Sequence, residues 1–499
     1  MSGSITELFR QAVDRNPAAA AIIAGGRVIS FGQLWQIAMA TAGLLHERGL
    51  RPGDFVALTM ERHPLHLATM LGLARLGVAA VPLHAALAPA VKARLAEKFG
   101  IRAVLADSKA AAIEGLPLVL LESVSSGDRS DAALGNYSPD ASTPFRVMLT
   151  SGTTGEPKGM LYTHGDFIRR MEASLEEAAG MRLVPPNLLI SVGAIYPLRV
   201  LCCGGTIVFP ESNEMAATIA AVQLHAVTHI LLSPWAAAQL LELAPQQGLI
   251  WPSIRHLRLV GGPASEMVLR LLSERISPRV YMSYGLTELG VVAIATPEEL
   301  LRDPAGAGRL RLGVRLEIVD DQEQVLPLAS RGQVRVWMEP FLGSYYREPA
   351  AVSAAFRDGW YYPGDIGRLA DDGMLFLEGR VDDILNIGGS KVAPGHIEQI
   401  LQSHPGVHEA VVFADGDEQG LTGLIAAVMA SQELTSEQLR KHFLPLLGDF
   451  TPAQFVVLEK FPRNPSGKTM RREVIDLARQ LMRGGKPQAA ADGRPRPLG

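Results

Sequence analysis

TSGTTGEPKG, the stretch Thr150–Gly159, says more about this chain than any other ten residues. It follows an apolar segment, Arg146–Thr150, and precedes a segment of helical periodicity that Asp166 could cap. Glycines allow tight turns, and the hydroxyls and backbone N–H groups of such a loop can donate hydrogen bonds to phosphate oxygens. It is not a Walker A loop, because Gly159 rather than Ser or Thr follows Lys158. We therefore expect a phosphate-binding loop between a strand and a helix.

Strand-like and helix-like segments alternate on both sides of this loop, up to about residue 305. Short apolar strands separated by helices indicate βαβ crossovers and therefore mostly parallel sheets. Two such arrays predict an α/β fold with two mostly parallel sheets packed with helices in one large N-terminal domain. The strand candidates that follow the loop are Ile190–Ile195, Thr206–Phe209, Val227–Leu232, His256–Val260 and Val280–Tyr284.

The pattern changes after about residue 305. Val314–Val319, Gln333–Trp337 and Met374–Glu378 alternate between apolar and polar residues, which predicts a small antiparallel sub-barrel. A second unit follows, with helices expected at His396–Ser403 and Arg471–Met482, and it reads as a small α+β domain. We expect an N-terminal domain over residues 1–380, a hinge over 381–383, a C-terminal domain over 384–482 and a disordered tail over 483–499.

The composition excludes several classes of protein. The 499 residues are enough for about two to four domains, and 47 basic against 51 acidic residues leave a net charge of −4. Such a balance gives no reason to expect a nucleic-acid or membrane partner. The two cysteines are neighbours, Cys202 and Cys203, which excludes a disulfide framework. With no signal-peptide pattern at the start, we expect a cytoplasmic protein.

Further motifs follow the loop in a fixed order. They are Gly261–Ala264 (GGPA), Tyr284–Glu288 (YGLTE), Tyr361–Asp365 (YYPGD), Gly379–Asp383 (GRVDD), Gly389–Pro394 (GSKVAP) and Pro462–Lys468 (PRNPSGK). With TSGTTGEPKG, this series resembles the ANL superfamily of adenylate-forming enzymes over about residues 5–480. The superfamily includes acyl- and aryl-CoA synthetases, peptide-synthetase adenylation domains and luciferases. The resemblance implies a mobile C-terminal lid that carries a catalytic lysine.

The implied chemistry needs cations. A carboxylate that attacks the α-phosphate of ATP meets like charge, and two unit charges about 4 Å apart repel by about 4 kcal/mol at an effective dielectric near 20. Lys468 could bridge both anions, with Mg²⁺ on the phosphates. The resemblance implies that Glu288 binds Mg²⁺ and that Thr287 contacts the α-phosphate. It also implies nucleotide contacts from Thr150, Ser151, Gly152, Thr153, Thr154, Gly155, Lys158, Gly262, Pro263, Ala264, Tyr284 (on adenine), Gly285, Asp365 (on the ribose hydroxyls) and Arg380.

Each of these residues also has an ordinary structural interpretation when it is taken alone. A lysine after glycine is usually solvated, and an aspartate after glycine usually belongs to a turn. Ser466–Thr469 even imitates the end of a Walker A loop, but Pro462 stands where the first glycine would be required. A P-loop NTPase is therefore the less favoured alternative, and it would release ADP instead of AMP and pyrophosphate.

The acid is expected to be an aryl or medium acyl acid. Ser191–Val200 contains no aspartate to pair with an α-ammonium group, and its one charge is Arg199. Ile195 stands where aryl-acid activators often have Asn, so the wall beside it should be apolar. The residues expected to line the acid pocket are Ala194, Ile195, Tyr196, Gly261, Ser283, Leu289 and Gly290.

The acceptor in the second half-reaction is expected to be coenzyme A, with a carrier protein or an amine as the alternatives. The resemblance places Gly388 and Gly389 beside the acceptor. It also implies that the C-terminal domain swings about Asp382, since a thiol or amine must replace Lys468 at the same site.

Overall fold

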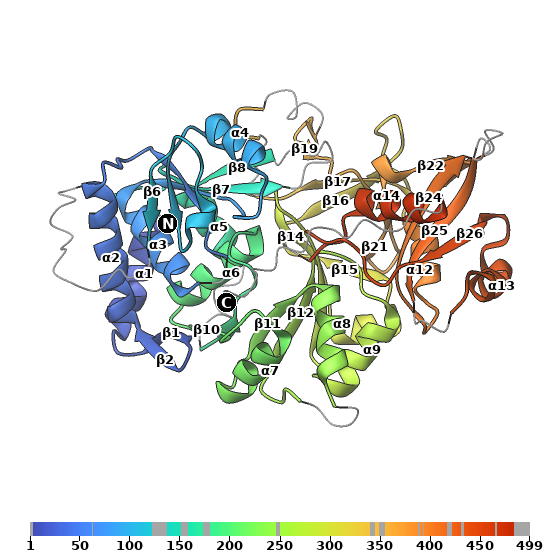
Figure 1. Ribbon diagram of the computed structural model, residues 1–499, viewed down its shortest axis with the longest axis horizontal. Helices are drawn as coiled ribbons and strands as arrows, with labels where there is room; N and C mark the ends of the chain where they lie inside the picture. Colours follow the sequence, from blue (N-terminus) through green and yellow to red (C-terminus); the bar gives the residue numbers. More distant parts are fainter. Residues whose placement is uncertain are drawn as a thin grey trace, which may run out of the picture.

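A parallel sheet with one antiparallel edge forms the first half of the large N-terminal part (Figure 1). Its strand order is β6-β5-β3-β4-β7-β8, and the pairs are parallel except β7 with β8. The strands are β3 (Phe55–Leu58), β4 (Ala79–Pro82), β5 (Ile101–Ala106), β6 (Leu118–Leu120), β7 (Pro144–Thr150) and β8 (Lys158–Thr163). The helices in this half are α1 (Ile5–Arg15), α2 (Phe31–Glu47), α3 (Pro64–Leu76), α4 (Pro89–Phe99), η1 (Lys109–Ala111) and α5 (His164–Glu172).

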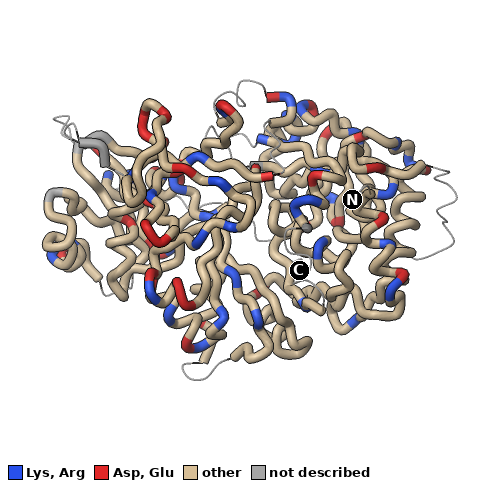
Figure 2. Tube along the Cα trace, turned by 180° about the vertical axis from the view of Figure 1, so that it is seen from behind, with Lys and Arg blue, Asp and Glu red and all other residues tan. Residues whose placement is uncertain are grey.

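The structure is a computed structural model. It describes residues 3–61, 63–121, 137–150, 158–172, 180–245, 250–339, 345–348, 355–387, 390–392, 394–416, 422–430, 434–464 and 467–483. Figure 2 shows acidic and basic residues interspersed along the described part of the chain, as the near-balanced composition leads one to expect. No helix within the described ranges is long and apolar enough to cross a membrane.

The second sheet begins parallel and continues antiparallel. Strands β10, β9, β11, β12 and β13 are parallel neighbours, and β14 then pairs antiparallel with β13. The parallel strands are β1 (Ala20–Ala24), β9 (Arg182–Val184), β10 (Thr206–Phe209), β11 (His229–Leu232), β12 (His256–Val260) and β13 (Val280–Leu286), and β2 (Arg27–Ser30) forms an antiparallel edge beside β1. Its helices are α6 (Ser191–Cys202), α7 (Met215–Leu224), α8 (Pro234–Leu243), α9 (Glu266–Arg275) and α10 (Pro297–Arg302).

The antiparallel strands expected after residue 305 are present, and they are hydrogen-bonded onto this second sheet through β14–β15 and β15–β21. They therefore extend the sheet instead of standing apart from it. Their bounds are β14 (Gly290–Ala295), β15 (Gly306–Leu310), β16 (Arg315–Val319), β17 (Gly332–Trp337), β18 (Phe356–Arg357), β19 (Trp360–Tyr361), β20 (Asp365–Leu369) and β21 (Met374–Arg380).

A smaller α+β unit lies at the other end of the molecule (Figure 1). It is built on β24 (Val407–Gly416), β25 (Thr422–Ala430) and β26 (Gln454–Val457), where β24–β25 is antiparallel and β25–β26 parallel. The remaining elements are η4 (Val381–Asp383), β22 (Leu385–Ile387), β23 (Ser390–Val392), α12 (Pro394–Leu401), α13 (Ser436–Leu447), η5 (Gly448–Phe450) and α14 (Arg471–Met482). The expected division into a large and a small part is thus confirmed.

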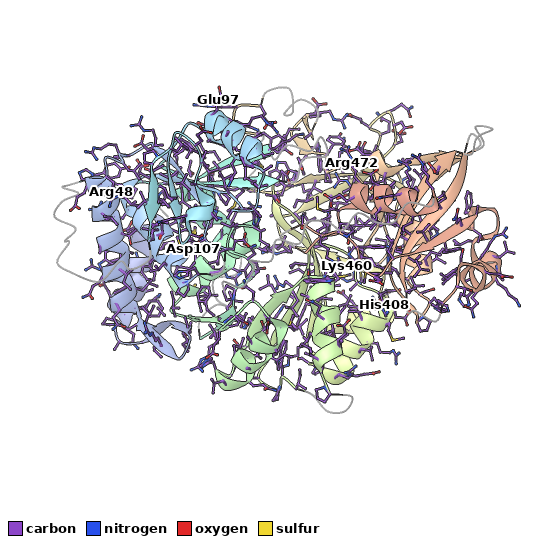
Figure 3. The ribbon with its side chains drawn as sticks, in the orientation of Figure 1. Arg48, Glu97, Asp107, His408, Lys460 and Arg472 are labelled. Atoms are coloured by element: carbon purple, nitrogen blue, oxygen red, sulfur yellow. The ribbon has the colours of Figure 1, made fainter. Side chains whose placement is uncertain are left out.

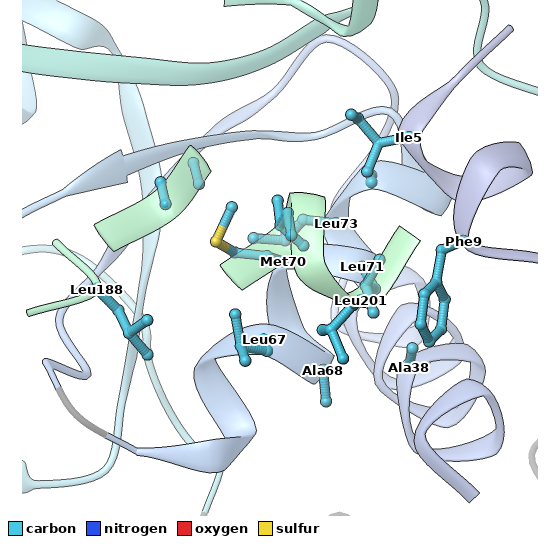
Figure 4. Packing of buried hydrophobic residues seen from close by; sticks show 14 of the residues in the cluster. Ile5, Phe9, Ala38, Leu67, Ala68, Met70, Leu71, Leu73, Leu188 and Leu201 are labelled. Carbon is cyan, nitrogen blue, oxygen red and sulfur yellow. The ribbon is translucent and has the colours of Figure 1, made fainter. Parts of the chain in front are cut away.

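Local sequence signals explain how several helices begin and end. Ser30 and Gln33 form the expected capping box, with Ser30 Oγ accepting from the Gln33 N–H at 3.2 Å. Helix α3 begins with Pro64 and ends at Gly77, which has the left-handed φ of 70° that glycine tolerates. Apolar faces of α1, α2, α3 and α6 then meet in one core, where Phe9, Leu71 and Leu201 lie close together (Figure 4).

Three local expectations are wrong. Ile190–Ile195 is not a strand, because Ser191–Cys202 forms helix α6. Apart from Ser191 and Arg199 this segment has no strongly polar side chain, so periodicity could not separate a buried strand from a buried helix. The loop after β7 leads into a second strand, β8, and the helix begins only at His164. Asp166 therefore lies within the first turn of α5, where its carboxylate accepts from the Thr163 N–H at 3.0 Å.

Candidate active site

Strands β7 and β8, which flank the TSGTTGEPKG segment, are neighbours at the edge of the first sheet. Thr150 pairs with Lys158 across the two strands, and the Lys158 ammonium lies 5.3 Å from the centre of the Tyr345 ring. A cation at this distance from an aromatic face is attracted by the ring quadrupole. Ser151, Gly152, Thr153, Thr154 and Gly155 lie outside the described residues, as does the Thr150 side chain.

Glu288 is a buried residue that shares a neighbour, Tyr345, with Lys158. It follows β13 and keeps 6% of its surface exposed, and its Oε1 accepts a hydrogen bond from the Tyr345 hydroxyl at 2.9 Å. Its backbone carbonyl accepts from the Tyr162 hydroxyl at 2.9 Å, and Arg170 donates to the Thr287 carbonyl at 3.1 Å. Side chains from β8 and α5 therefore hold the Thr287–Glu288 turn in place.

The tyrosines around Glu288 are neutral donors. Burial raises the pKa of Tyr162 to about 12. Burial, together with the negative charge of Glu288, also raises the pKa of Tyr345 and that of Tyr361. Because these hydroxyls keep their protons at physiological pH, they act as hydrogen-bond donors, Tyr162 to the backbone carbonyl of Glu288 and Tyr345 to its carboxyl group.

The donor set at Glu288 fits a magnesium ion that is held mainly by phosphates. Mg²⁺ is usually bound in nucleotide sites by one or two carboxylates together with substrate phosphates, and less often by an all-protein cage. Within the described ranges, no group of three or more His, Cys, Asp or Glu side chains could hold a metal ion. A single carboxylate held by hydrogen bonds, such as Glu288, is the protein ligand such an ion requires.

Asp365 and Arg380 face each other across strands β20 and β21. The Tyr284 hydroxyl donates to Asp365 Oδ2 at 2.5 Å, and Arg380 Nη1 lies 3.8 Å from Oδ1. Burial raises the pKa of Asp365, while the Tyr284 hydrogen bond and the Arg380 charge oppose that rise. Tyr284, expected on adenine, is thus also tied to the carboxylate expected on the ribose.

Gly364 makes room for this pair. Its φ is +79°, and a Cβ there would lie 3.1 Å from Arg380 Nη2, which donates to the Pro363 carbonyl at 2.7 Å. A larger residue would therefore be strained and would press on the arginine. The Gly-Asp pair at the end of the YYPGD motif has a steric reason as well as a chemical one.

Lys468 lies on a tight turn of the small unit that packs on the large one. Its backbone N–H donates to Asn464 Oδ1 at 2.9 Å. A Cβ on the preceding Gly467 would lie 3.1 Å from Ser233 Oγ, at the start of α8, and the Arg463 guanidinium lies 5.4 Å from the centre of the Trp235 ring. The turn is therefore pressed against the large part of the chain.

Lys468 is exposed at the surface, yet the charges of the site act on its ammonium group. Burial and the neighbouring Arg380 charge lower the pKa of Lys468, and the negative charges of Asp365 and Asp383 oppose this. The structure thus brings together Lys468, Arg380 and Asp365, which are far apart in sequence and come from both parts of the chain.

The other residues expected in the nucleotide site, the hinge and the acceptor channel differ in their exposure, and some lie outside the described residues. Gly262, Pro263 and Gly285 are exposed at the carboxyl ends of β12 and β13, and Ala264 is half-buried beside them. Asp382 lies in η4, the single turn that joins the two parts, and is exposed. Gly388 and Gly389 lie outside the described residues.

The residues expected to line the acid pocket do not form one group. Tyr196 lies in the middle of α6 and Ser283 in the middle of β13, whereas Gly261 directly follows β12. Ala194 and Ile195 are buried in the core shared with α3, and Leu289 is buried in a separate core beneath β14–β17. Gly290 lies against Arg170. Ala194 and Leu289 are too deeply buried to line an open pocket.

Several contributors to the site were not expected from the sequence, namely Tyr162, Arg170 and Tyr345. Tyr162 and Arg170 are eight residues apart, a spacing that crosses from β8 into α5 and matches neither the period of a strand nor that of a helix. The adjacent pair Tyr345-Tyr346 was the one available signal, because aromatic pairs in a polar loop tend to have buried partners.

Comparisons with known proteins agree with this geometry. The AMP-binding enzyme family matches residues 9–346, and the AMP-binding enzyme C-terminal domain matches residues 396–468. A fatty acid–[acyl-carrier-protein] ligase of Streptomyces coeruleorubidus is 28% identical, over 92% of this chain and 93% of its own. A 2-succinylbenzoate–CoA ligase of Bacillus mycoides is 27% identical, over 91% of this chain and 94% of its own.

Two solved structures illustrate the fold. O-succinylbenzoate coenzyme A synthetase from Bacillus subtilis, in complex with ATP and magnesium ion, superposes with a TM-score of 0.85 at 25% identity, covering 95% of this chain and 100% of that one. An amide bond synthetase from Marinactinospora thermotolerans superposes with a TM-score of 0.82 at 24% identity, covering 95% of this chain and 99% of that one.

Proposed function

This chain belongs to the AMP-binding enzyme family and is an adenylate-forming ligase, and we propose that it activates an aryl or medium acyl carboxylic acid for transfer to coenzyme A. In the first half-reaction the carboxylate attacks the α-phosphorus of ATP, and pyrophosphate leaves. In the second, the thiol attacks the acyl carbon, and AMP leaves. The proposal requires one site that serves both steps.

The placement of Lys468 is the observation that carries this proposal. Lys468 lies in the small unit, close enough to Asp365 and Arg380 for their charges to act on its pKa, while Glu288 lies in the large part and is hydrogen-bonded to Tyr345. In the proposed mechanism Lys468 neutralises the charge that builds up between the carboxylate and the α-phosphate. Glu288 would hold Mg²⁺, which neutralises the leaving pyrophosphate, and the Thr287 hydroxyl would contact the α-phosphate.

The remaining residues would position the nucleotide. Asp365 would accept hydrogen bonds from the two ribose hydroxyls, a role that its ionised form fills best. Arg380 would support the ribose–phosphate region, Tyr284 would contact adenine, and Lys158 would approach the phosphates from the loop.

An α-amino acid is disfavoured as the substrate. Tyr196 lies between the guanidinium groups of Arg199 and Arg258, which are 5.4 Å and 5.6 Å from its ring centre. An ammonium group beside these cations would be repelled, and a buried charge without a counter-ion is costly. This supports an acid that carries no amine next to the reacting carboxylate.

Coenzyme A is the proposed acceptor, and a carrier protein or an amine is the alternative. The names of the relatives give different acceptors, because one is a CoA ligase and another an acyl-carrier-protein ligase. The three acceptors share the first half-reaction and differ only in the nucleophile of the second. They are therefore separated by adding each acceptor to a preformed acyl-adenylate.

A pyrophosphate-release assay with a panel of carboxylic acids tests the proposal. We expect AMP and pyrophosphate as products, with Mg²⁺ required, and CoA consumed only when a productive acid is present. Production of ADP with every acid would contradict adenylation and would favour a P-loop type of reaction.

The variant Lys468→Ala tests the role of the lysine. We expect adenylate formation to fall about 10²–10³-fold with ATP binding nearly intact, because the lysine acts mainly on charge that develops in the transition state. Lys460→Ala is the matched control, since Lys460 is an exposed lysine of the same unit (Figure 3). If Lys468→Ala adenylates at the wild-type rate, Lys158 becomes the next candidate.

A further inference from the structure

A group of cationic and aromatic side chains lies on the face of the second sheet toward α6. We name it the Arg258 cluster, and it consists of Tyr196, Arg199, His229, His256, Arg258 and Tyr281. The cluster is made by strand register: His229 pairs with His256, and Arg258 pairs with Tyr281. The His256 and Tyr281 rings stack with centres 3.6 Å apart, and the His229 ring follows at 5.8 Å.

The alternation along β12 explains why these side chains share one face. Leu257 and Leu259 are fully buried in the core beneath α8 and α9, whereas His256, Arg258 and Val260 point to the opposite side. That side faces α6, because Arg258 Nη1 donates a hydrogen bond to the Tyr196 hydroxyl. Tyr196, His229, His256, Arg258 and Tyr281 all keep part of their surface exposed, so the face is not closed by packing.

Arg258 is a cation that the surrounding residues do not neutralise. Among the described residues, none of its contacts is a carboxylate; they are the hydroxyl and the ring of Tyr196. A guanidinium has five N–H donors in a planar fork, and one hydroxyl leaves most of that fork unused. A half-buried cation of this kind is stabilised when an anion fills the remaining donors.

The two histidines of the cluster carry no charge. Burial, followed by the positive charge of Arg258, lowers the pKa of His229 to about 4 and that of His256 to about 3. Both rings are therefore neutral at physiological pH, and the Arg199 charge acts on them in the same direction. The cluster is a positive region with tyrosine and imidazole donors around it.

The Arg258 cluster lies on the strand face that leads to the expected position of the reacting centre. In parallel sheets, ligands bind outside the carboxyl ends of the strands, and β12 ends at Val260 next to the Gly261–Ala264 segment. Arg258 is two residues before Val260 on the same face, and three before Gly261. At about 3.3 Å per residue, its Cα is roughly 7–10 Å from that end of the strand. An acid that reaches down this face would meet Arg258 with its far end.

We propose that the acid activated by this chain is a dicarboxylic acid, whose second carboxylate is bound by Arg258 in the Arg258 cluster. This rests on the proposed function, because it names the class of acid that enters the same site. The planar fork of arginine matches a carboxylate in a bidentate manner, so the donors that Arg258 does not use for Tyr196 suit the two oxygens of a carboxylate.

The test compares matched acids that differ only at the far end. Linear α,ω-dicarboxylic acids of increasing length and aromatic dicarboxylic acids are each assayed against their half methyl esters by pyrophosphate release. We expect the best dicarboxylic acid to exceed its half ester in kcat/KM by about 10–100-fold, the usual size of a charge-assisted pair. A half ester that is used as well as its dicarboxylic acid, at every length, would overturn the inference.

Variants of Arg258 test whether this residue causes the preference for a dicarboxylic acid over its half ester. We expect Arg258→Gln to bring the ratio of kcat/KM values close to one while the half ester is still activated, and Arg258→Lys to keep an intermediate ratio through its charge. Arg255→Gln is the control, because Arg255 is an exposed arginine next to β12 and outside the cluster. Thermal midpoints of all variants show whether a loss comes from folding, and the Lys variant serves if the Gln variant does not fold.

The outcomes separate this inference from the function on which it rests. A ratio that stays the same in Arg258→Gln overturns the role of Arg258. Pyrophosphate release with monocarboxylic acids alone overturns the dicarboxylic class and leaves adenylation intact. Absence of acid-dependent pyrophosphate release with every acid would overturn the proposed function, and the inference with it.

Discussion

Replacing Tyr345 by phenylalanine removes a single hydroxyl from the proposed magnesium site. That hydroxyl donates to Glu288 Oε1 at 2.9 Å, and both residues are 6% exposed, so water cannot easily replace it. The ring itself would stay in place, because it packs on Phe356 at 5.5 Å and carries the Lys158 ammonium at 5.3 Å from its centre. Tyr345→Phe therefore removes a hydrogen bond from the Glu288 carboxylate and leaves the packing of the ring in place.

The size of the effect follows from the type of hydrogen bond. A bond to a buried charged group contributes about 1.5–3 kcal/mol, and partners that orient a metal ligand typically contribute about 10–100-fold in metal affinity. We therefore expect Tyr345→Phe to raise the Mg²⁺ concentration needed for half-maximal activity by about 10–100-fold. Because the carboxylate itself remains, saturating Mg²⁺ should restore most of kcat.

The assay is acid-dependent pyrophosphate release measured against Mg²⁺ concentration at saturating ATP. Tyr346→Phe is the matched control, because Tyr346 is stacked on Phe55 and Phe99 at 5.5 Å and 5.9 Å, and its hydroxyl has no hydrogen bond to any described residue. We expect its Mg²⁺ curve to match that of the wild type. An unchanged curve for Tyr345→Phe, or equal shifts in both variants, would refute the assignment of Mg²⁺ to Glu288.

Two further predictions concern the hinge and the ribose carboxylate. Asp382 lies in the 3₁₀ turn η4, and residues in 3₁₀ turns typically have a φ of about −50° to −70°, which proline adopts. Asp382→Pro should therefore keep adenylate formation and slow transfer to CoA about 100-fold. Single-turnover measurements separate the steps, and equal slowing of both would place the pivot elsewhere. Tyr284→Phe removes a hydrogen bond that lowers the pKa of Asp365, a carboxyl whose pKa burial already raises. The acidic limb of kcat/KM should therefore move to higher pH, and a limb that stays in place would contradict a role for ionised Asp365.

Much of the architecture could be predicted from the sequence, because its local signals agree with one another. Strands β10 and β12 and helix α14 have the bounds expected, since each is an apolar or amphipathic run with clear ends. Motif order also predicted that Lys468 belongs to a separate small unit. Helix α6 was missed because it has almost no strongly polar side chain, and only the tertiary context decides whether such a run becomes strand or helix.

The parts of the site that the sequence could not predict are contacts between elements far apart in the chain. Tyr345 reaches Glu288 across 57 residues, and Arg258 reaches Tyr196 across 62. No local periodicity encodes such pairs, because each depends on which strands become neighbours in the folded sheet. The acid pocket was also expected to be apolar from Ile195 alone, whereas the next residue, Tyr196, brings Arg258 into that region.

The charges around Lys468 give a physical reason for the small unit to move between the two half-reactions. Lys468 and Arg380 are cations in one site, and the lowered pKa of Lys468 reflects their mutual repulsion as well as burial. Under the proposed mechanism, the phosphates of ATP offset this repulsion and favour the arrangement in which Lys468 faces Asp365. When pyrophosphate leaves, most of that negative charge leaves with it, and the two cations again repel each other. The chemistry of the first step would thus weaken the contact that must open for the second, while Asp382 provides the place where the chain can turn.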